Sequence, residues 1–533
     1  MPDFKQTPYL NSAHGGALSC WECILAAGHF MIKKILIANR GEIAVRIIRA
    51  CVEMRIGTVA VYSDADRAAL HVRMADEAIH IGPAPSRESY LVIENIIRAA
   101  KQAEADAIHP GYGFLSENAA FAQACADAGI TFIGPSPKAI ALMGSKIESR
   151  RAVSRFGVPM VPGTVDPVER DEEARTVASS VGYPIMLKAS AGGGGKGMRL
   201  VRSDAELTEA LRNTRAEASA AFGDSAVYIE KFVVEPRHIE IQVLADTHGN
   251  AVHLGERECT IQRRHQKVIE ECPSPVMDSD LRGRMGKAAL DVVRAAEYTN
   301  AGTVEFLVDR NRHFYFLEMN TRLQVEHAVT EMVTGIDLVK EQIRVADGEK
   351  LGFSQDEVAM NGSAIECRIY AEDPGNNFFP SPGMIQLLQT PSGPGIRDDS
   401  GVYEGWTVPI DYDPLISKLV AWGPTRRDAM DRMQRALREY RVKGIQTNLN
   451  FFMELLNDSD FRSGQFDTGF IDKWMKNRIA PSPPSQVERD LAVLGAILAE
   501  MEKGKSPAEL AETDTNETPS LWKTTGRRQS LRH

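Results

Sequence analysis

Residues 34–62 read KILIANRGEIAVRIIRACVEMRIGTVAVY, and this stretch decides the fold of the first part of the chain. Lys34–Ala38 and Thr58–Tyr62 are short apolar runs that suit buried strands, and Glu42–Met54 has the length and apolar spacing of a helix. A strand, a helix and a second strand in this order predict a βαβ unit and a parallel sheet. Apolar runs of the same kind recur further on, so we predict a doubly wound α/β domain over residues 31–145.

The rest of the chain divides into segments with different predicted secondary structure. Residues 146–350 contain short hairpin-like strands and glycine-rich turns, whereas residues 362–477 combine strands with a long helix. Together they predict a mixed α/β and α+β fold. A tail over 481–533 contains apolar residues at helical spacing, which predict an amphipathic helix. Residues 1–30 lack the basic and apolar regions of a signal peptide, so we expect a disordered extension there.

Composition and charge exclude several classes of protein. With 43% hydrophobic and 25% charged residues among 533, the chain is typical of globular proteins. A formal net charge of −10 gives no global electrostatic reason to bind nucleic acid. No apolar run approaches the ~20 residues needed to span a bilayer, so we expect no membrane insertion. The seven cysteines follow no disulfide or zinc spacing, which favours free thiols in the cytoplasm.

The most prominent motif is the glycine-rich segment AGGGGKGM at residues 191–198. A dinucleotide fingerprint needs a helix after its glycines, and a P-loop needs Gly-Lys followed by Ser or Thr. Neither is present, because a strand pattern at 198–201 follows. A glycine loop between two strands can close on phosphates through its backbone amides, and Lys188 before it adds positive charge. The alternative is a mobile surface hairpin without a ligand.

A second group of residues suits a metal ion. Residues 302–308 and 313–320 read as two strands joined by a short turn, and an antiparallel register that fits this turn puts Glu305 and Glu318 on one face. Asn320 shares that face. Two carboxylates and an amide oxygen form a hard-oxygen site suited to Mg²⁺ beside nucleotide phosphates. The alternative is an exposed polar strand face.

The second of these strands, if it stays extended to residue 326, aligns further polar groups with the carboxylates. Arg322, Gln324 and Glu326 then point the same way, so that a metal ligand, a cation, an amide and a base lie in one row. The segment 257–267 adds a cluster of basic residues that predicts an anion-binding patch. A solvated run of charges is the alternative for that segment.

Together these motifs resemble biotin carboxylase, the ATP-grasp component of biotin-dependent carboxylases. The resemblance runs from about residue 31 to 477, and RLQVEH at 322–327 and HQK at 265–267 are its most specific parts. The segments that carry it are 37–44, 109–118, the glycine loop, 262–267, 318–327 and 366–374. The resemblance implies an N-terminal domain over 31–145, an ATP-grasp domain over 146–350 and a C-terminal mixed α/β domain over 362–477.

Position by position, the resemblance also implies roles for individual residues. Glu326 is similar to the general base, and Arg368 to the residue that meets biotin or carboxyphosphate. The implied catalytic residues are Arg322, Glu326, Lys267 and Arg368. The implied ligands of Mg²⁺ (or Mn²⁺) are Glu305, Glu318 and Asn320. The implied contacts to ATP are Lys146, Lys188, Gly194, Gly195, Glu230, Lys231, Val233, His238 and His265. Gln324 and Val325 join Lys267 and Arg322 in the implied bicarbonate pocket. The turn at 309–312 carries one residue more than the family pattern, and we expect it to leave the carboxylate pair intact.

The resemblance implies a reaction in which MgATP and bicarbonate carboxylate biotin. The biotinyl-lysine motif Met-Lys-Met is absent, so we expect biotin on a separate biotin carboxyl carrier protein, with carboxyltransferase subunits as further partners and a homodimer as the assembly. The tail is a candidate for docking these partners, and the alternative is a packed terminal helix followed by a disordered end. An acetyl-CoA carboxylase, a carboxylase of another acyl-CoA and a pyruvate carboxylase all remain open. The competing interpretations are a catalytically silent nucleotide-binding protein and other ATP-grasp ligases, such as carbamoyl-phosphate-type or carboxyamino-purine enzymes.

Overall fold

The structure is a computed structural model that describes residues 31–164, 166–189, 197–477 and 486–502. The expected extension at 1–30 and the loop glycines Gly194 and Gly195 lie outside the described residues. The chain divides into two compact units, Met1–Asp472 and Lys473–His533, which are described separately.

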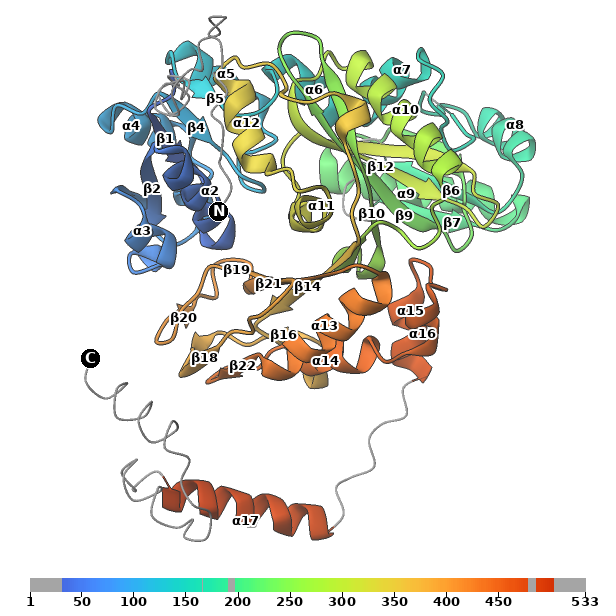
Figure 1. Cartoon of the computed structure of the whole chain (residues 1–533). Coiled ribbons are helices and arrows are strands. Elements are labelled where there is room, and N and C mark those ends of the chain that lie inside the picture. The colour runs from blue at the N-terminus through green and yellow to red at the C-terminus, as the bar shows by residue number, and fades with distance from the viewer. Residues whose placement is uncertain (1–30, 165, 190–196, 478–485, 503–533) are drawn as a thin grey trace, which may run out of the picture. The chain divides into compact units, whose positions relative to one another are not determined.

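A five-stranded parallel sheet forms the first domain, as the sequence predicts (Figure 1). Strand β1 is buried on both faces: Ile35 and Ile37 pack with α2, while Leu36 packs with α4. This burial is typical of the centre of a doubly wound sheet. The strand order is β3 (Glu77–Gly82), β2 (Gly57–Ser63), β1 (Lys34–Ile37), β4 (Ala107–His109) and β5 (Thr131–Phe132). The helices are α2 (Gly41–Met54), α3 (Leu70–Met74), α4 (Ile93–Gln102) and α5 (Ala119–Asp127), followed by α6 (Pro137–Gly144) and α7 (Lys146–Ser154).

An eight-stranded antiparallel sheet forms the centre of the first unit. Its order is β13 (Phe314–Asn320), β12 (Asn300–Val308), β9 (Arg237–Ala245), β10 (Ala251–Arg263), β11 (Gln266–Cys272), β14 (Ser363–Tyr370), β21 (Leu415–Gly423) and β19 (Ile396–Ser400). Helix α10 (Ser279–Ala295) packs its apolar face on β9, β12 and β13. Because β11 pairs with β14, one sheet spans the 146–350 and 362–477 segments.

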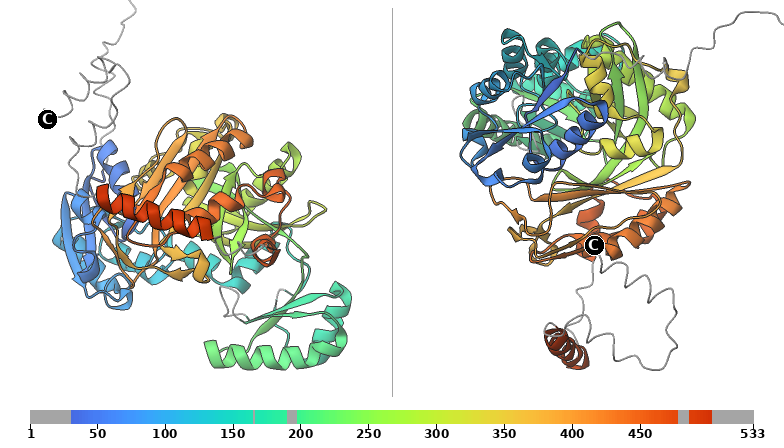
Figure 2. Two further views of the ribbon diagram at one scale, coloured as in Figure 1. Left: turned by 90° about the horizontal axis from the view of Figure 1, so that it is seen from below. Right: turned by 60° about the vertical axis from the view of Figure 1, so that its left-hand side comes forward.

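A smaller sheet of three antiparallel strands carries the ends of the glycine-rich loop. Strands β6 (Ile185–Ala189) and β7 (Met198–Val201) flank that loop, and β8 (Val227–Lys231) pairs with β6. Helices α8 (Asp171–Val181) and α9 (Asp204–Phe222) pack on this sheet through one apolar cluster (Figure 2). The strand after the glycines is therefore confirmed, and the helix of a dinucleotide fingerprint is absent at this position.

The remaining elements include several helices and short strands. Helix α13 (Arg426–Glu439) matches the predicted long helix, and α11 (His327–Thr334) and α12 (Leu338–Ala346) follow β13. The short helices are α14 (Leu449–Leu455), α15 (Ser459–Ser463) and α16 (Phe470–Asn477). The short strands are β15 (Glu372–Asp373), β16 (Phe379–Pro380), β17 (Gly383–Met384), β18 (Leu387–Gln389), β20 (Thr407–Val408) and β22 (Arg441–Lys443).

One expectation about secondary structure is wrong. Strand β13 ends at Asn320, and residues 321–326 form an irregular turn that leads into α11, with Glu326 at the N-cap position of that helix. In the second unit, the predicted tail helix is α17 (Gln486–Glu502). Among the described residues, none of the helices combines the length and apolar character that a bilayer span requires.

Candidate active site

The hairpin of β12 and β13 places the predicted carboxylate pair at the floor of a cleft. Glu305 and Glu318 are direct cross-strand partners, and a register shift follows at Phe306, so the longer turn leaves the pair intact. Asn320 donates a 2.8 Å hydrogen bond from Nδ2 to Oε1 of Glu305. Burial and the charge of Glu305 raise the pKa of Glu318. Two carboxylates that repel one another in this way gain from a shared divalent cation.

Lys267 connects this hairpin to the neighbouring strands. From β11, its Nζ lies 2.5 Å from Glu240 Oε2, 2.9 Å from Glu305 Oε1 and 2.6 Å from Glu326 Oε1. Burial by itself lowers the pKa of Lys267, but the three carboxylates outweigh it and raise the pKa well above its usual range. The ammonium is therefore a permanent positive charge at the centre of the site.

Glu326 is fully buried between cations. Its Oε2 accepts a 2.9 Å bond from Arg368 Nη2, and its Oε1 faces Lys267. Burial favours the protonated acid, but Lys267, Arg368 and Arg257 outweigh burial and hold the pKa of Glu326 well below its usual range. The carboxylate is thus ionised at neutral pH, as a general base must be before it can accept a proton.

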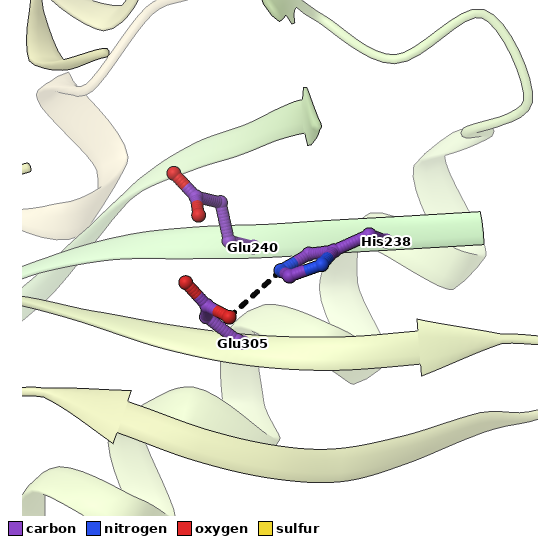
Figure 3. A group of neighbouring side chains, drawn as sticks. All are labelled: His238, Glu240 and Glu305. Atoms are coloured by element: carbon purple, nitrogen blue, oxygen red, sulfur yellow. Dashed lines mark ion pairs between the residues drawn. The ribbon is translucent and has the colours of Figure 1, made fainter. Parts of the chain in front are cut away.

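His238 points toward Glu305 from the adjacent strand β9, which also carries Glu240 (Figure 3). His238 Nε2 lies 2.8 Å from Glu305 Oε2, and burial, which lowers the pKa of the imidazole, is outweighed by Glu305, which raises it. These three residues could also hold a cation. However, Glu240 is fully buried and paired with the Lys267 ammonium, whereas Glu318 is exposed in the cleft, so the pair Glu305 and Glu318 is the better metal position.

Arg322 and Gln324 reach the same cleft from the irregular turn. Arg322 donates a 2.9 Å bond to Gln324 Oε1, a 3.3 Å bond to Asn320 Oδ1 and a 2.8 Å bond to Glu117 Oε2. Gln324 in turn donates to Glu305 at 3.4 Å. The residues that were expected to align along a strand therefore still converge, although the turn brings them together instead.

Two adjoining cavities contain most of the predicted site residues. The first, of about 440 Å³, is lined by Lys267, Glu305, Glu318, Asn320, Arg322, Gln324, Val325, Glu326 and Arg368, together with His238 and His265. The second, of about 360 Å³, is lined by Lys188, Glu230, Lys231 and Val233, again with His238 and His265. Its walls also include apolar residues such as Val161, Met186 and Leu317, which suit a planar aromatic ring such as a nucleotide base. A charged cavity therefore opens into a more apolar one.

The cations of the second cavity are held in different ways. Lys188 Nζ lies 2.5 Å from Glu230, which also contacts Arg150. Lys231 donates to the carbonyls of Gly182 at 2.7 Å and Tyr183 at 3.0 Å, which directs its charge toward that turn. Lys146, at the start of α7, is not among the lining residues of this cavity; burial lowers its pKa, and it lies in the electrostatic field of Glu318 and Glu230.

A third cavity, of about 380 Å³, meets the first at Arg368 and Val325. It lies between the first domain, which contributes Tyr112 and Gly113, and the strands that carry Arg368. Arg368 is fixed by its 2.6 Å bond from Nε to Glu270 Oε1. The guanidinium therefore stands at the boundary between two cavities.

Several functional residues were not predicted from the sequence. Glu240 is one, although His238, Glu240 and Gln242 alternate with apolar residues and so occupy one strand face. Arg257, fully buried, donates a 2.5 Å bond to Glu240 and further bonds to Gln242 and Thr330. Glu270 is another. Glu240 and Glu270 support the cavity walls without belonging to a predicted motif. Arg257 starts the basic segment 257–267, but it is fully buried against Glu240 and so is not part of an exposed anion-binding patch.

Comparisons with known proteins agree with this geometry. The family description "Biotin carboxylase, N-terminal domain" matches residues 31–140, "Carbamoyl-phosphate synthase L chain, ATP binding domain" matches 145–354, and "Biotin carboxylase C-terminal domain" matches 366–473. The biotin carboxylase of Nostoc sp. is 56% identical over 443 residues, which cover 83% of this chain and 99% of that protein.

Two further relatives extend the comparison. A pyruvate carboxylase subunit of Methanothermobacter thermautotrophicus is 53% identical over 447 residues, covering 84% of this chain and 91% of that protein. The crystal structure of the biotin carboxylase domain dimer of Hydrogenobacter thermophilus 2-oxoglutarate carboxylase, in complex with MgADP, ADP and bicarbonate, matches with a TM-score of 0.78 and 48% identity. That match covers 84% of this chain and 98% of the other.

Proposed function

The chain belongs to the biotin carboxylase family of ATP-dependent carboxylases with the ATP-grasp fold, and on that premise we propose that it carboxylates biotin on a separate carrier protein. The reaction uses MgATP and bicarbonate and supplies an acetyl-CoA carboxylase or a carboxylase of another acyl-CoA. The observation that carries the proposal is the ionised Glu326, held between Lys267 and Arg368 beside the paired carboxylates of β12 and β13.

The nucleotide binds in the cavity that contains Lys188, His238 and His265. Its apolar walls receive the adenine base, and Lys188 and Lys146 face the phosphates. Glu305, Glu318 and Asn320 would hold Mg²⁺, which would offset negative charge on the phosphates. The close carboxylate pair fits this ion, because burial and mutual repulsion already oppose the charge on Glu318.

Bicarbonate binds in the charged cavity, between Arg322, Lys267 and the Glu326 carboxylate. Glu326 accepts the proton of the bicarbonate hydroxyl as that oxygen attacks the γ-phosphorus, and ADP leaves with the electrons of the broken P–O bond. A general base contributes typically ~10²–10⁴ to such a rate. Lys267 and Arg322 offset the charge that builds up on the anion.

The product of this step in the family is carboxyphosphate, which breaks down to CO₂ and phosphate. The phosphate takes a proton from biotin, and the biotin nitrogen attacks CO₂. Arg368 suits this stage because it lines both the bicarbonate cavity and the third cavity, through which the biotin of a carrier can approach. A fixed guanidinium there stabilises the anionic intermediates.

The expected surroundings of the enzyme are part of the proposal. A homodimer is supported by the dimeric Hydrogenobacter relative, and a carrier protein and a carboxyltransferase are the expected partners. Five described cysteines are free and buried, which supports a reducing compartment such as the cytoplasm. The Methanothermobacter relative favours a second candidate, the biotin-carboxylating component of a pyruvate carboxylase.

The test of the proposal is ADP release by the purified chain with MgATP, with and without bicarbonate and free biotin. Turnover should require bicarbonate and rise with biotin. It should fall by ~10²-fold or more in Glu326→Ala. The matched control is Glu297→Ala, which removes an exposed glutamate that pairs with Lys138 on the surface. Turnover indifferent to biotin would redirect the assignment to another ATP-grasp ligase.

A further inference from the structure

Lys418 is a fully buried lysine in strand β21, and it does not line the cavities described above. Its Nζ donates a 2.7 Å hydrogen bond to the backbone carbonyl of Val325. The same atom lies 3.5 Å from Glu42 and 3.9 Å from Asp399. Lysine is almost never fully buried unless it is paired, and pairing explains only part of this arrangement, because a carbonyl is its nearest partner.

The position of Lys418 in the sheet relates it to the catalytic residues. It is the cross-strand partner of Arg368 on β14 and of Asp399 on β19, so the three residues form a row across the sheet. Arg368 binds the Glu326 side chain at 2.9 Å, and Lys418 binds the carbonyl of the residue before it. Two adjacent strands thus hold two consecutive residues of one turn.

The side chains of this turn have several partners, among them Arg368 for Glu326 and Glu117 for Arg322, but its backbone is not part of a sheet. Residues 321–326 belong to neither a strand nor a helix, so no backbone ladder sets their orientation. The Val325 carbonyl is part of the peptide group that leads into Glu326. A hydrogen bond to that carbonyl fixes the plane of the peptide and, with it, the direction in which the Glu326 side chain leaves the backbone.

We propose that Lys418 is a positioning residue that sets the turn carrying Val325 and Glu326 in the geometry needed to bind and deprotonate bicarbonate. The inference rests on the proposed function of the site. Lys418 acts through the backbone and touches neither the substrate nor the reacting atoms. Displacing a catalytic group by about 1 Å can cost ~10²-fold in rate, so one well-placed hydrogen bond carries a large kinetic effect.

The counter-charges of Lys418 show why a simple substitution needs care. Glu42 comes from α2 in the first domain, and neither of its carboxylate oxygens has a hydrogen-bond partner among the described residues. Removing only the lysine would leave that buried carboxylate without its nearest cation, and breaking a buried pair is strongly destabilising. The double variant Glu42→Gln/Lys418→Met removes both charges together and avoids this cost.

The experiment measures KM for bicarbonate and for ATP, and kcat, in wild type, Lys418→Met, Lys418→Arg and the double variant, with thermal stability recorded for each. Both methionine variants should raise the KM for bicarbonate so that kcat/KM for bicarbonate falls ~10–100-fold, while kcat and the KM for ATP stay within about twofold of wild type. Lys418→Arg, which can still donate to the carbonyl, should recover most of the loss. If Lys418→Met does not fold, the double variant supplies the same readout.

Arg426→Met is the matched control. It removes a partly buried cation, which pairs with Glu271 at 2.5 Å, and it should lower stability without changing the ratio of the two kcat/KM values. A selective loss toward bicarbonate in the double variant, absent in Arg426→Met, supports the proposal. An unchanged ratio in the double variant overturns it. Wild-type turnover that does not need bicarbonate would instead refute the proposed function itself.

Discussion

The Lys267 ammonium lies 2.6 Å from Oε1 of Glu326 and simultaneously contacts Glu240 and Glu305. One cation therefore contacts the proposed base, the hairpin proposed to bind the metal, and strand β9. A lysine suits this position because its ammonium presents three donors from a single atom, whereas a guanidinium presents a flat fork.

Lys267→Met should therefore damage both stability and catalysis. Three buried carboxylates would lose a shared counter-charge, which costs about 3–5 kcal/mol for a broken buried pair. Bicarbonate-dependent ADP release should fall by ~10²-fold. Chemical denaturation and steady-state kinetics measure the two effects. Lys267→Arg separates them: it should keep more of the stability than Lys267→Met but little of the rate. A methionine variant with wild-type stability and rate would contradict this view of the site.

Metal dependence should report on the carboxylate pair. Glu318→Gln removes one charge from the proposed Mg²⁺ site, and the free Mg²⁺ needed for half-maximal ADP release should rise about tenfold. A chelator should abolish turnover in both proteins. Titration of Mg²⁺ at saturating ATP gives the measurement, and Glu297→Gln, at the exposed surface, gives the control. An identical Mg²⁺ requirement in Glu318→Gln would place the ion elsewhere.

Folding stability should depend on pH through Glu42. Burial raises its pKa from about 4.5 to about 7, and Lys418 only partly offsets this effect. The folded state therefore binds the proton more tightly than the unfolded state, so the contribution to stability is complete below pH 4.5 and is lost as pH rises toward 7. Between pH 4.5 and 8, the free energy of unfolding should therefore fall by up to about 3 kcal/mol less in Glu42→Gln than in wild type.

Urea denaturation between pH 4.5 and 8 tests that expectation. Glu270 also has a pKa raised to about 7 by burial, and its contribution stays in both proteins, so only the difference between wild type and Glu42→Gln is informative. Parallel stability curves for the two proteins would show that Glu42 is already ionised across the range.

The tail should matter for partners and little for chemistry. Val487, Leu491 and Leu494 of α17 are 67%, 62% and 55% exposed, so this helix offers apolar side chains to a partner. The truncated chain should carboxylate free biotin at the wild-type rate and lose activity only toward biotin on the carrier or in the assembled carboxylase. Assays with free biotin and with carrier protein make the comparison. An equal loss in both assays would assign the tail a role inside the enzyme.

Much of the site could be predicted because its residues follow patterns that are local in the sequence. The pair Glu305 and Glu318 follows from strand alternation and a short turn, and both constraints act over about twenty residues. The prediction that the strand extends to Glu326 was wrong. Polar and apolar residues continue to alternate in the sequence after Asn320, but the chain turns there to begin α11. Polar residues at every second position are compatible with a strand, but they do not require one.

The supporting charges could not be predicted in the same way. Arg257, Glu270 and Lys418 are buried by contacts with strands far away in the sequence, and each resembles an ordinary charged residue in its own segment. Only tertiary packing pairs Lys418 with the carbonyl of Val325, 93 residues earlier. Long-range pairing of buried charges leaves no periodic signal in a single sequence.

The continuous sheet has a consequence for dissecting and recombining this protein. Because β11 pairs with β14 through four residue pairs, a cut between residues 350 and 362 would create two unpaired strand edges, and such edges promote aggregation. A chimera that takes residues 362 onward from a relative would have to preserve the β11–β14 register and the hydrogen bond from Lys418 to the Val325 carbonyl. The family descriptions assign residues 145–354 and 366–473 to separate domains, but the hydrogen bonds between β11 and β14 join these two segments in one sheet.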